Sequence, residues 1–380
     1  MSSRSATIIP IRKSNASQGA RDLPAANIYA ANTSDANTSD AHPLDTLRRP
    51  LRDLRISVTD RCNFRCTYCM PRSVFTPDYP YLARSELLSF DEITRFARIA
   101  VGLGVEKIRL TGGEPLLRKE LPALVAQLAA LPNAPELTLT TNAALLAKHA
   151  QALKNAGLQR ITVSLDALDD AVFKRMNDAD YGVAQVLAGI AAAQAAGFEQ
   201  VKVNCVVQKS VNLSQVLPLA QHFKGSGVTV RFIEFMDVGT SNGWRMDDVV
   251  PSQQLVDLIH ARHPIAPLAA HYAGEVAQRW QYADGSGEIG FISSVTQAFC
   301  QDCSRLRLAT NGQLFTCLFA QNGWDARVLL RDESISDAHI TARLQALWAQ
   351  RSDQYSALRT AQTAKQTTAM PKVEMSFIGG

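Results

Sequence analysis

Six short apolar and β-branched runs alternate with helical segments between Leu51 and about residue 240. This alternation is typical of βαβ units, in which parallel strands are joined by helices of roughly ten to fifteen residues. Helices are predicted near 91–103, after the capping-box sequence from Ser89 to Glu92, and at 145–156 and 183–196, each followed by a glycine. The predicted strands are Leu54–Thr59, Lys107–Thr111, Glu136–Thr141, Arg160–Leu165, Val201–Val207 and Val228–Phe235.

Six such repeats are too few for a closed eight-fold barrel, so the expected fold is α/β, an open partial (β/α)6 barrel with its helices outside. Ligands of such folds bind at the carboxyl ends of the strands. The unusual residues of this chain follow predicted strands, at 62–69, 112–115, 141–142, 164–166 and 234–236. We therefore expect the functional site at this edge of the sheet.

The remainder of the chain divides by composition. Residues 1–46 contain the tandem repeat ANTSD and too few apolar residues to form a core, so this low-complexity extension is predicted to be disordered. The barrel is expected at 47–240. Residues 241–336 are irregular and hold a second group of cysteines, which predicts a smaller C-terminal domain. Residues 337–380 are predicted to contain a helix at about 337–349 and a Gly-Gly tail.

The charge and cysteine content limit the classes of partner. A formal net charge of +4 is too small to indicate nucleic acid or a membrane surface as a partner. No apolar stretch is long enough to span a membrane, and the first residues lack the apolar segment of a signal peptide. Seven cysteines, an odd number in 380 residues, are typical of a reducing compartment. We therefore expect a cytoplasmic protein.

Three cysteines directly follow the first predicted strand. Cys62, Cys66 and Cys69 have the spacing C-x3-C-x2-C, which is compact enough to ligate three irons of a cubane cluster and leave the fourth iron open. An open iron can bind and reduce a ligand. A structural zinc site is the alternative, but such sites need four protein ligands, and no histidine nearby completes the set.

Three further cysteines lie in the C-terminal region. Cys300, Cys303 and Cys317 have the spacing C-x2-C-x13-C, again without an obvious fourth ligand. A zinc ribbon of the Cys3His type remains open here. Its fourth ligand would be His260, His263, His271 or His339. Cys205, at the centre of a predicted strand, is interpreted as a small buried hydrophobic residue.

Four arginines stand where charge is unexpected. Arg55 and Arg109 lie within predicted strands, where an unpaired charge is costly, so each is expected to meet an anion. Structural pairing with Asp53, Asp60 or Glu114 is the alternative. Arg305 and Arg307 are two positions apart, so in an extended chain both guanidinium groups face one side. Guanidinium groups suit phosphate oxygens or the edge of guanine, although a solvated basic face is the alternative.

Two segments resemble the radical S-adenosylmethionine (radical SAM) enzymes, namely LRDLRISVTDRCNFRCTYCMP at 51–71 and TGGEPLLR at 111–118. The C-x2-C-x-R-x-R segment from Cys300, with Cys317 behind it, and the terminal Gly-Gly resemble one family among them, which cyclises GTP in molybdenum cofactor biosynthesis. The resemblance extends from about Leu51 to Gly380. It implies a barrel of the radical SAM type with a smaller C-terminal iron-sulfur domain.

The resemblance also implies a lyase with two [4Fe-4S] clusters and S-adenosylmethionine as cofactors. The first cluster, on Cys62, Cys66 and Cys69, would cleave S-adenosylmethionine, and the resulting 5′-deoxyadenosyl radical would take the 3′ hydrogen of GTP. Bond formation between C3′ and C8 would then give 3′,8-cyclo-7,8-dihydro-GTP. The second cluster, on Cys300, Cys303 and Cys317, would bind the guanine.

Further partners follow from the same resemblance. They are a reductant such as a flavodoxin or ferredoxin and the cyclic pyranopterin monophosphate synthase that receives the product, and a homodimer is compatible with it.

The residue roles that the resemblance implies fall into three groups. Contacts to S-adenosylmethionine would be made by Tyr68, Gly113, Ser164 and Met236. Contacts to GTP would be made by Arg55, Arg109, Thr140, Lys202, Arg305, Leu306 and Arg307. Besides the first three cysteines, the catalytic residues would be Arg305, Arg307, Gly379 and Gly380, the two glycines forming a mobile tail that reaches the site. Fraying is the alternative for any C-terminus. One departure is Ala143, where the family usually has glycine; a positive φ there would disfavour alanine.

Two other functions remain open at the level of sequence. A radical SAM peptide maturase with an auxiliary cluster would usually carry more C-terminal cysteines than three and lack the Arg305/Arg307 pair. A zinc-binding interaction module would be colourless when purified without oxygen, whereas clusters would make the protein brown.

Overall fold

The computed structural model describes residues 42–272, 274–362 and 372–379. The predicted disorder of residues 1–41 and the tail residue Gly380 lie outside this part. Residues 42–46 belong to the fold, although the sequence analysis assigned them to the disordered extension. Asp45 is only 5% exposed because it pairs with arginines, one of them more than 300 residues away in the sequence.

The strands of the described part form one sheet in the order β12-β11-β10-β1-β2-β3-β4-β5-β6-β9-β8-β7. Strands β1 to β6 are parallel neighbours in sequence order, which confirms the α/β fold with its (β/α)6 arrangement. They are β1 (Asp53–Ser57), β2 (Lys107–Thr111), β3 (Glu136–Thr141), β4 (Arg160–Ser164), β5 (Val201–Val207) and β6 (Thr229–Glu234). The remaining strands are β7 (Ile265–Leu268), β8 (Gln278–Tyr282), β9 (Glu288–Ile292), β10 (Arg305–Leu308), β11 (Gln313–Phe315) and β12 (Trp324–Asp325).

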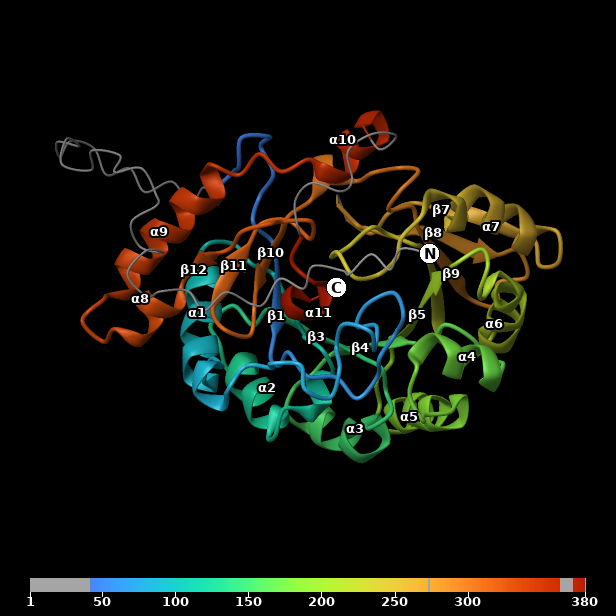
Figure 1. Ribbon diagram of the computed structural model, residues 1–380, viewed down its shortest axis with the longest axis horizontal. Coiled ribbons are helices and arrows are strands. Elements are labelled where there is room, and N and C mark those ends of the chain that lie inside the picture. Colours follow the sequence, from blue (N-terminus) through green and yellow to red (C-terminus); the bar gives the residue numbers. More distant parts are fainter. Residues whose placement is uncertain (1–41, 273, 363–371, 380) are drawn as a thin grey trace, which may run out of the picture.

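The helices cover the outer face of this curved sheet, as Figure 1 shows for α1 to α6. The capping box at Ser89 and Glu92 is present and starts the first helix. The helices are α1 (Phe90–Gly102), α2 (Leu121–Ala129), α3 (Leu146–Asn155), α4 (Asp170–Asn177), α5 (Val183–Ala195), α6 (Val216–Phe223), α7 (Ser252–His260), α8 (Arg327–Arg331), α9 (Asp337–Ala349), α10 (Tyr355–Gln362) and α11 (Met375–Ile378). Short 3-10 helices are η1 (Arg84–Glu86), η2 (Pro115–Leu117), η3 (Leu213–Gln215), η4 (Met246–Asp248) and η5 (Cys300–Asp302).

Alternation along the strands separates the core from the site. Leu54, Ile108 and Val203 are fully buried in the main hydrophobic core, and Cys205 lies there as expected. Their neighbours along the strands face the opposite side, because successive side chains of a strand point to opposite faces. Hydrophobic packing therefore holds the helices on one face and leaves the other face to polar residues.

The C-terminal region extends the sheet at both edges. Strand β10 pairs in parallel with β1, and β9 pairs in parallel with β6. The sequence predicted neither pairing, because each joins strands from distant parts of the chain. In the described part of the chain, no helix is both long and apolar enough to cross a membrane.

Candidate functional site

A cavity of about 340 Å³ lies at the inner face and carboxyl ends of the strands, where the sequence predicted the site. All six cysteines of the two triads line this cavity, and none is in a disulfide. The first triad is Cys62, Cys66 and Cys69, and the second is Cys300, Cys303 and Cys317. The fold thus brings together two motifs that are more than 200 residues apart in the sequence.

The first triad lies on the loop after β1, which packs against the loop after β2. Gly113 permits this contact, since a Cβ atom there would collide with the carbonyl oxygen of Arg61. The amide of Phe64 approaches the Cys62 sulfur at 3.4 Å, as expected for a thiolate ligand held by its own loop. Burial raises the pKa of the Cys62 thiol to about 12, so a bound metal rather than bulk pH would have to displace the proton.

The second triad lies at the junction of the C-terminal strands. Cys300 begins η5, Cys303 precedes β10, and Cys317 follows β11. Both Nε and Nη2 of Arg305 donate to the Cys303 sulfur at 3.3 Å. Burial opposes ionisation of Cys303, but the charges of Arg305 and Arg351 outweigh it and lower the pKa to about 6. This environment favours a thiolate, the form in which cysteine binds metal.

The donor sets fit clusters with three protein ligands better than zinc. Among the described residues, no histidine lines the cavity. The His260 ring instead contacts the backbone of Ile265 at 3.0 Å. No group of three His, Cys, Asp or Glu side chains in the described ranges is arranged to hold a single metal ion. Within the described ranges, the zinc-ribbon alternative therefore lacks its histidine ligand at the second triad.

Cationic side chains form a row across the sheet beside the cysteines. Arg55 on β1 lies in register with Arg307 on β10 and with Arg109 on β2. Lys202 on β5 and Arg231 on β6 continue the row along the cavity wall. In the part of the chain that the structure describes, none of the five forms an ion pair. We call Arg55, Arg109, Lys202, Arg231 and Arg307 the cationic row.

Burial makes this charge costly. Burial, followed by the neighbouring charges of Arg305 and Arg109, lowers the pKa of Arg55 to about 9. Burial is also the main cause that lowers the pKa of Arg109 to about 10 and that of Lys202 to about 8. The three acidic partners considered from sequence bond elsewhere. Glu114 accepts from Thr141 and Asn142, and Asp60 accepts from the Leu82 amide. Asp53 accepts from the Ser304 hydroxyl at 2.9 Å and lies 3.9 Å from the Lys107 amine. The row therefore has the chemical character of an anion-binding site.

Hydroxyl and amide groups hold the cationic side chains in place. Arg109 donates to Thr140 at 3.0 Å and to Thr162 at 3.3 Å. Arg231 donates to the Asn204 side chain at 2.9 Å and also reaches Thr162 at 3.3 Å. These neutral partners orient the guanidinium groups but leave their charge uncompensated.

The four residues expected to contact S-adenosylmethionine come from separate loops and strands. Tyr68, Gly113, Ser164 and Met236 all line the cavity. The Tyr68 hydroxyl donates to Asp166 at 2.7 Å, and Asp166 in turn accepts from the amide of Val206 at 2.8 Å. Tyr68 is thereby fixed against the ends of β4 and β5, so its position is set before any ligand binds.

Two expected site residues are placed differently from the rest. The Leu306 side chain is fully buried in the hydrophobic core, on the face of β10 opposite the two arginines, so it does not line the cavity. Gly379 does not line the cavity either, but its carbonyl accepts a hydrogen bond from Arg307. Helix α11 packs there through Phe377 and Ile378, which are almost fully buried. The described end of the tail is therefore anchored beside the site.

Ala143 confirms the departure noted in the sequence. Its φ is 61°, in the left-handed region that disfavours alanine. The amide of Ala143 donates to Thr141 at 3.0 Å, which closes the turn after β3. The turn expected for glycine is thus kept, and Thr140 still lines the cavity.

Arg231 is the main residue that sequence reasoning missed. It lies within a predicted strand, where the same argument that singled out Arg55 and Arg109 applies. A charge at an inward-facing strand position was therefore a usable signal.

Comparison with known proteins agrees with the site. The model of the Radical SAM superfamily matches residues 56–223, and that of Molybdenum Cofactor Synthesis C matches residues 228–357. A partial barrel with three cysteines after its first strand defines the radical SAM class of α/β proteins. The C-terminal match covers the whole segment that carries the second triad.

Curated relatives give the family. The chain is 52% identical over 356 residues to a protein of Acidothermus cellulolyticus named GTP 3′,8-cyclase, a match covering 88% of this chain and 98% of the relative. Proteins of the same name from Xanthomonas campestris (strain B100) and Staphylococcus epidermidis (strain ATCC 35984) are 53% and 47% identical, covering 88% of this chain and 97% and 98% of theirs. The chain belongs to the GTP 3′,8-cyclase family.

Solved structures support the fold. Streptococcus suis SuiB bound to its precursor peptide SuiA matches with a TM-score of 0.56 at 15% identity, covering 87% of this chain and 75% of SuiB. SuiB bound to S-adenosylmethionine matches with the same score at 14% identity, covering 82% of this chain and 70% of SuiB. At this identity the likeness concerns the fold alone.

Proposed function

We propose that this chain is a lyase that converts GTP to 3′,8-cyclo-7,8-dihydro-GTP with S-adenosylmethionine, in the first step of molybdenum cofactor biosynthesis. The observation that carries the proposal is that two cysteine triads and an uncompensated cationic row line one cavity. The relatives named GTP 3′,8-cyclase support the same reading over almost their whole length. They also favour it over the peptide maturase alternative.

The first triad is the proposed site of the reducing cluster. A [4Fe-4S] cluster held by Cys62, Cys66 and Cys69, when bound, supplies the electron that cleaves S-adenosylmethionine to the radical that takes the 3′ hydrogen of GTP. Tyr68, Gly113, Ser164 and Met236 line the cavity and are proposed to hold S-adenosylmethionine. The Tyr68–Asp166 hydrogen bond fixes one wall of that subsite.

The cationic row is the proposed triphosphate site. GTP carries several negative charges. Binding of the triphosphate would offset the cost of burying the positive charges of Arg55, Arg109 and Lys202. Thr140 is proposed to bind through the hydroxyl that now accepts from Arg109. Leu306 would have to contact GTP through its backbone, because its side chain lies in the core.

The second triad and the tail complete the proposed machinery. A second [4Fe-4S] cluster on Cys300, Cys303 and Cys317 is proposed to face the guanine, with Arg305 and Arg307 beside it. Gly379 is proposed to act through the contact of its carbonyl with Arg307, and Gly380 lies outside the described residues. We further propose a cytoplasmic setting, a flavodoxin or ferredoxin as reductant, and a cyclic pyranopterin monophosphate synthase as recipient of the product.

Anaerobic reconstitution with iron and sulfide tests the proposal. With dithionite, S-adenosylmethionine and GTP, we expect 5′-deoxyadenosine and the cyclised nucleotide, both detected by mass spectrometry. Cys62→Ser should abolish cleavage of S-adenosylmethionine. Cys300→Ser should retain cleavage but lose the cyclised product. Cleavage stimulated by a peptide and not by GTP would instead support the maturase alternative.

A further inference from the structure

A buried ionic cluster lies behind the second triad. Asp45 and Arg49, from the segment before β1, meet Arg351, which follows α9. Asp45 Oδ2 accepts from Arg49 Nε at 2.6 Å and from Arg351 Nη1 at 3.1 Å. The three side chains are at most 2% exposed, so these charges are held away from water.

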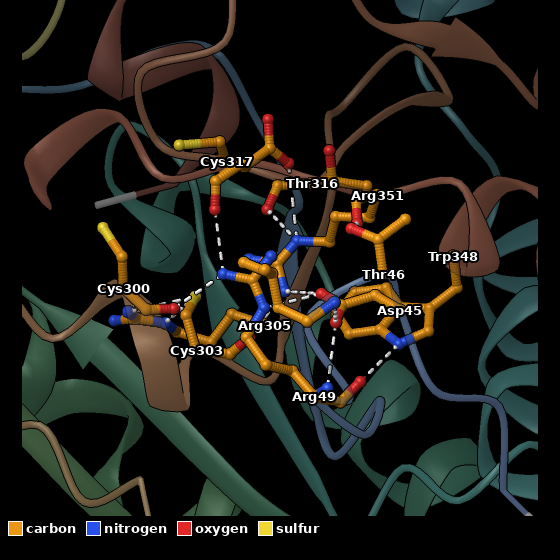
Figure 2. Close-up of polar contacts among 12 residues, drawn as sticks. Asp45, Thr46, Arg49, Cys300, Cys303, Arg305, Thr316, Cys317, Trp348 and Arg351 are labelled. Atoms are coloured by element: carbon orange, nitrogen blue, oxygen red, sulfur yellow. Dashed lines mark hydrogen bonds and ion pairs between the residues drawn. The ribbon is translucent and has the colours of Figure 1, made fainter. Parts of the chain in front are cut away.

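The two guanidinium groups bind the backbone that carries the cysteines, as Figure 2 shows. Arg49 Nη1 donates to the carbonyl oxygen of Cys300 at 2.6 Å. Arg351 Nη1 donates to the carbonyl of Cys303 at 2.6 Å, and its Nε donates to the carbonyl of Thr316 at 3.1 Å. Each of the three cysteine-bearing segments is thus held at a cysteine or at the residue before one.

The surrounding contacts fix the cluster as a unit. The Trp348 indole nitrogen donates to the carbonyl of Arg49 at 3.0 Å, and the Arg351 guanidinium lies over the Trp348 ring at 4.7 Å. The Thr46 amide and hydroxyl both donate to the Arg351 carbonyl. In the described part of the chain, neither Arg49 nor Arg351 makes a hydrogen bond to a cysteine sulfur.

We infer that Asp45, Arg49 and Arg351 are positioning residues for the second triad, an inference that rests on the proposed second cluster. The carbonyl contacts set the peptide planes at Cys300, Cys303 and Thr316, and these planes set the directions in which the three sulfurs point. Charge-assisted hydrogen bonds are short and strong, and Asp45 holds both donors in one orientation. Outer-shell groups of this kind orient metal ligands and strengthen metal binding.

The test measures iron on each triad separately, in the full chain after anaerobic reconstitution. In one background the first triad is removed by Cys62→Ser, Cys66→Ser and Cys69→Ser, so only the second triad can bind iron. In the other background the second triad is removed by Cys300→Ser, Cys303→Ser and Cys317→Ser, so only the first triad can bind iron. Arg49→Ala is added to both, and the readouts are iron loss to a chelator and the electron paramagnetic resonance spectrum of the reduced protein.

We expect Arg49→Ala to speed iron loss from the second triad by about 10- to 100-fold and to broaden its spectrum, and to leave the first triad unchanged. Arg49→Lys, which keeps the charge but not the planar fork, should recover part of the loss. The matched control is Arg95→Ala. Arg95 likewise binds one carboxylate, of Asp337, and two backbone carbonyls, but none near a cysteine. It should leave both triads unchanged.

Three results would overturn the inference. Equal iron loss from both triads would indicate general instability, and unchanged iron on both would remove the positioning role. An equal effect of Arg95→Ala on the second triad would show that loss of any arginine bound to a carboxylate and to backbone carbonyls suffices. If the second triad binds no iron even with Arg49 present, the proposed second cluster itself fails, and the positioning role fails with it.

Discussion

The protonation of the single residue Lys202 should depend on whether an anion is bound at the proposed triphosphate site. Burial, followed by the charges of Arg231 and Arg160, lowers its pKa to about 8. A bound triphosphate would raise this pKa again, so the complex should hold more protons than the free protein just above pH 8. We therefore predict proton uptake on GTP binding and weaker affinity as the pH rises through about 8.

Calorimetry of GTP binding in buffers of different ionisation enthalpy measures this uptake. Lys202→Met should abolish it, and uptake that persists in that variant would assign the proton to another group.

The same pKa of Lys202 predicts an effect of pH on the stability of the unliganded protein. Because the unfolded lysine titrates near 10.4, the unfolded chain holds more protons between the two pKa values. The free energy of unfolding should therefore rise with pH across this range.

Arg307 should show opposite effects on stability and on binding. Burial, Arg55 and Arg305 all lower its pKa, so the charge is unfavourable in the unliganded protein. Arg307→Met removes the charge at similar length. It should raise the free energy of unfolding without GTP but weaken GTP binding by about 1.5–3 kcal/mol, roughly 10- to 150-fold in affinity.

Chemical denaturation and equilibrium binding measure the two effects of Arg307→Met. The control is Arg98→Ala, since Arg98 is an exposed arginine paired with Asp337. Unchanged affinity in Arg307→Met would remove Arg307 from the GTP site. Cleavage of S-adenosylmethionine without turnover should continue in this variant.

At the level of residues, the sequence was informative where an unusual side chain stood in a regular pattern. The cysteine spacings and the strand positions of Arg55 and Arg109 pointed to residues that line one cavity. Asp45 could not be identified in this way, because its role depends on Arg351, which lies 306 positions later. No local pattern encodes such a pairing.

The turn before β1 is an element whose stability can be improved. Asp45 Oδ1 accepts from the amides of Leu47 and Arg49, and this turn places Arg48 at a φ of 60°. Arg48 is exposed, so its side chain gains little from the fold. Arg48→Gly should stabilise the protein by about 1 kcal/mol through relief of the left-handed backbone.

Thermal or chemical unfolding measures the gain at position 48. Arg48→Ala is the control, because it removes the same charge but keeps a Cβ atom. An equal gain in both variants would attribute the effect to charge instead of backbone conformation.

The end of the chain is an element expected to act on turnover and not on cluster loading. Gly379 has a φ of 74°, and a Cβ atom there would collide with Thr111. Gly379→Ala should therefore displace the carbonyl that contacts Arg307. We expect a lower rate of product formation with unchanged iron content. A normal rate would indicate that the tail is only packed beside the site.

Elements built from local sequence were predicted well. Strands β2, β3 and β5 have the predicted bounds, and α9 does as well. Local rules explain this, since strand alternation and helix caps involve neighbouring residues. Strands β7 to β12 were missed, because they are short and lie in a region of irregular sequence. Two of them, β9 and β10, join the sheet by pairing with β6 and β1, which lie far away in the sequence.

At the level of the whole molecule, the two edges of the sheet bring the C-terminal region back to the barrel. Pairing of β10 with β1 sets Arg307 beside Arg55, and pairing of β9 with β6 extends the opposite edge of the sheet. The reaction proposed here requires this arrangement, because the radical made at the first triad must reach a nucleotide held at the second.

The most direct test of the central claim is isotope transfer from GTP deuterated at the 3′ position. The reconstituted protein is reduced with dithionite in the presence of S-adenosylmethionine, and 5′-deoxyadenosine is analysed by mass spectrometry. The account predicts deuterium in 5′-deoxyadenosine together with the cyclised nucleotide. Cleavage of S-adenosylmethionine without deuterium transfer would contradict it, because GTP would then not be the substrate of the radical.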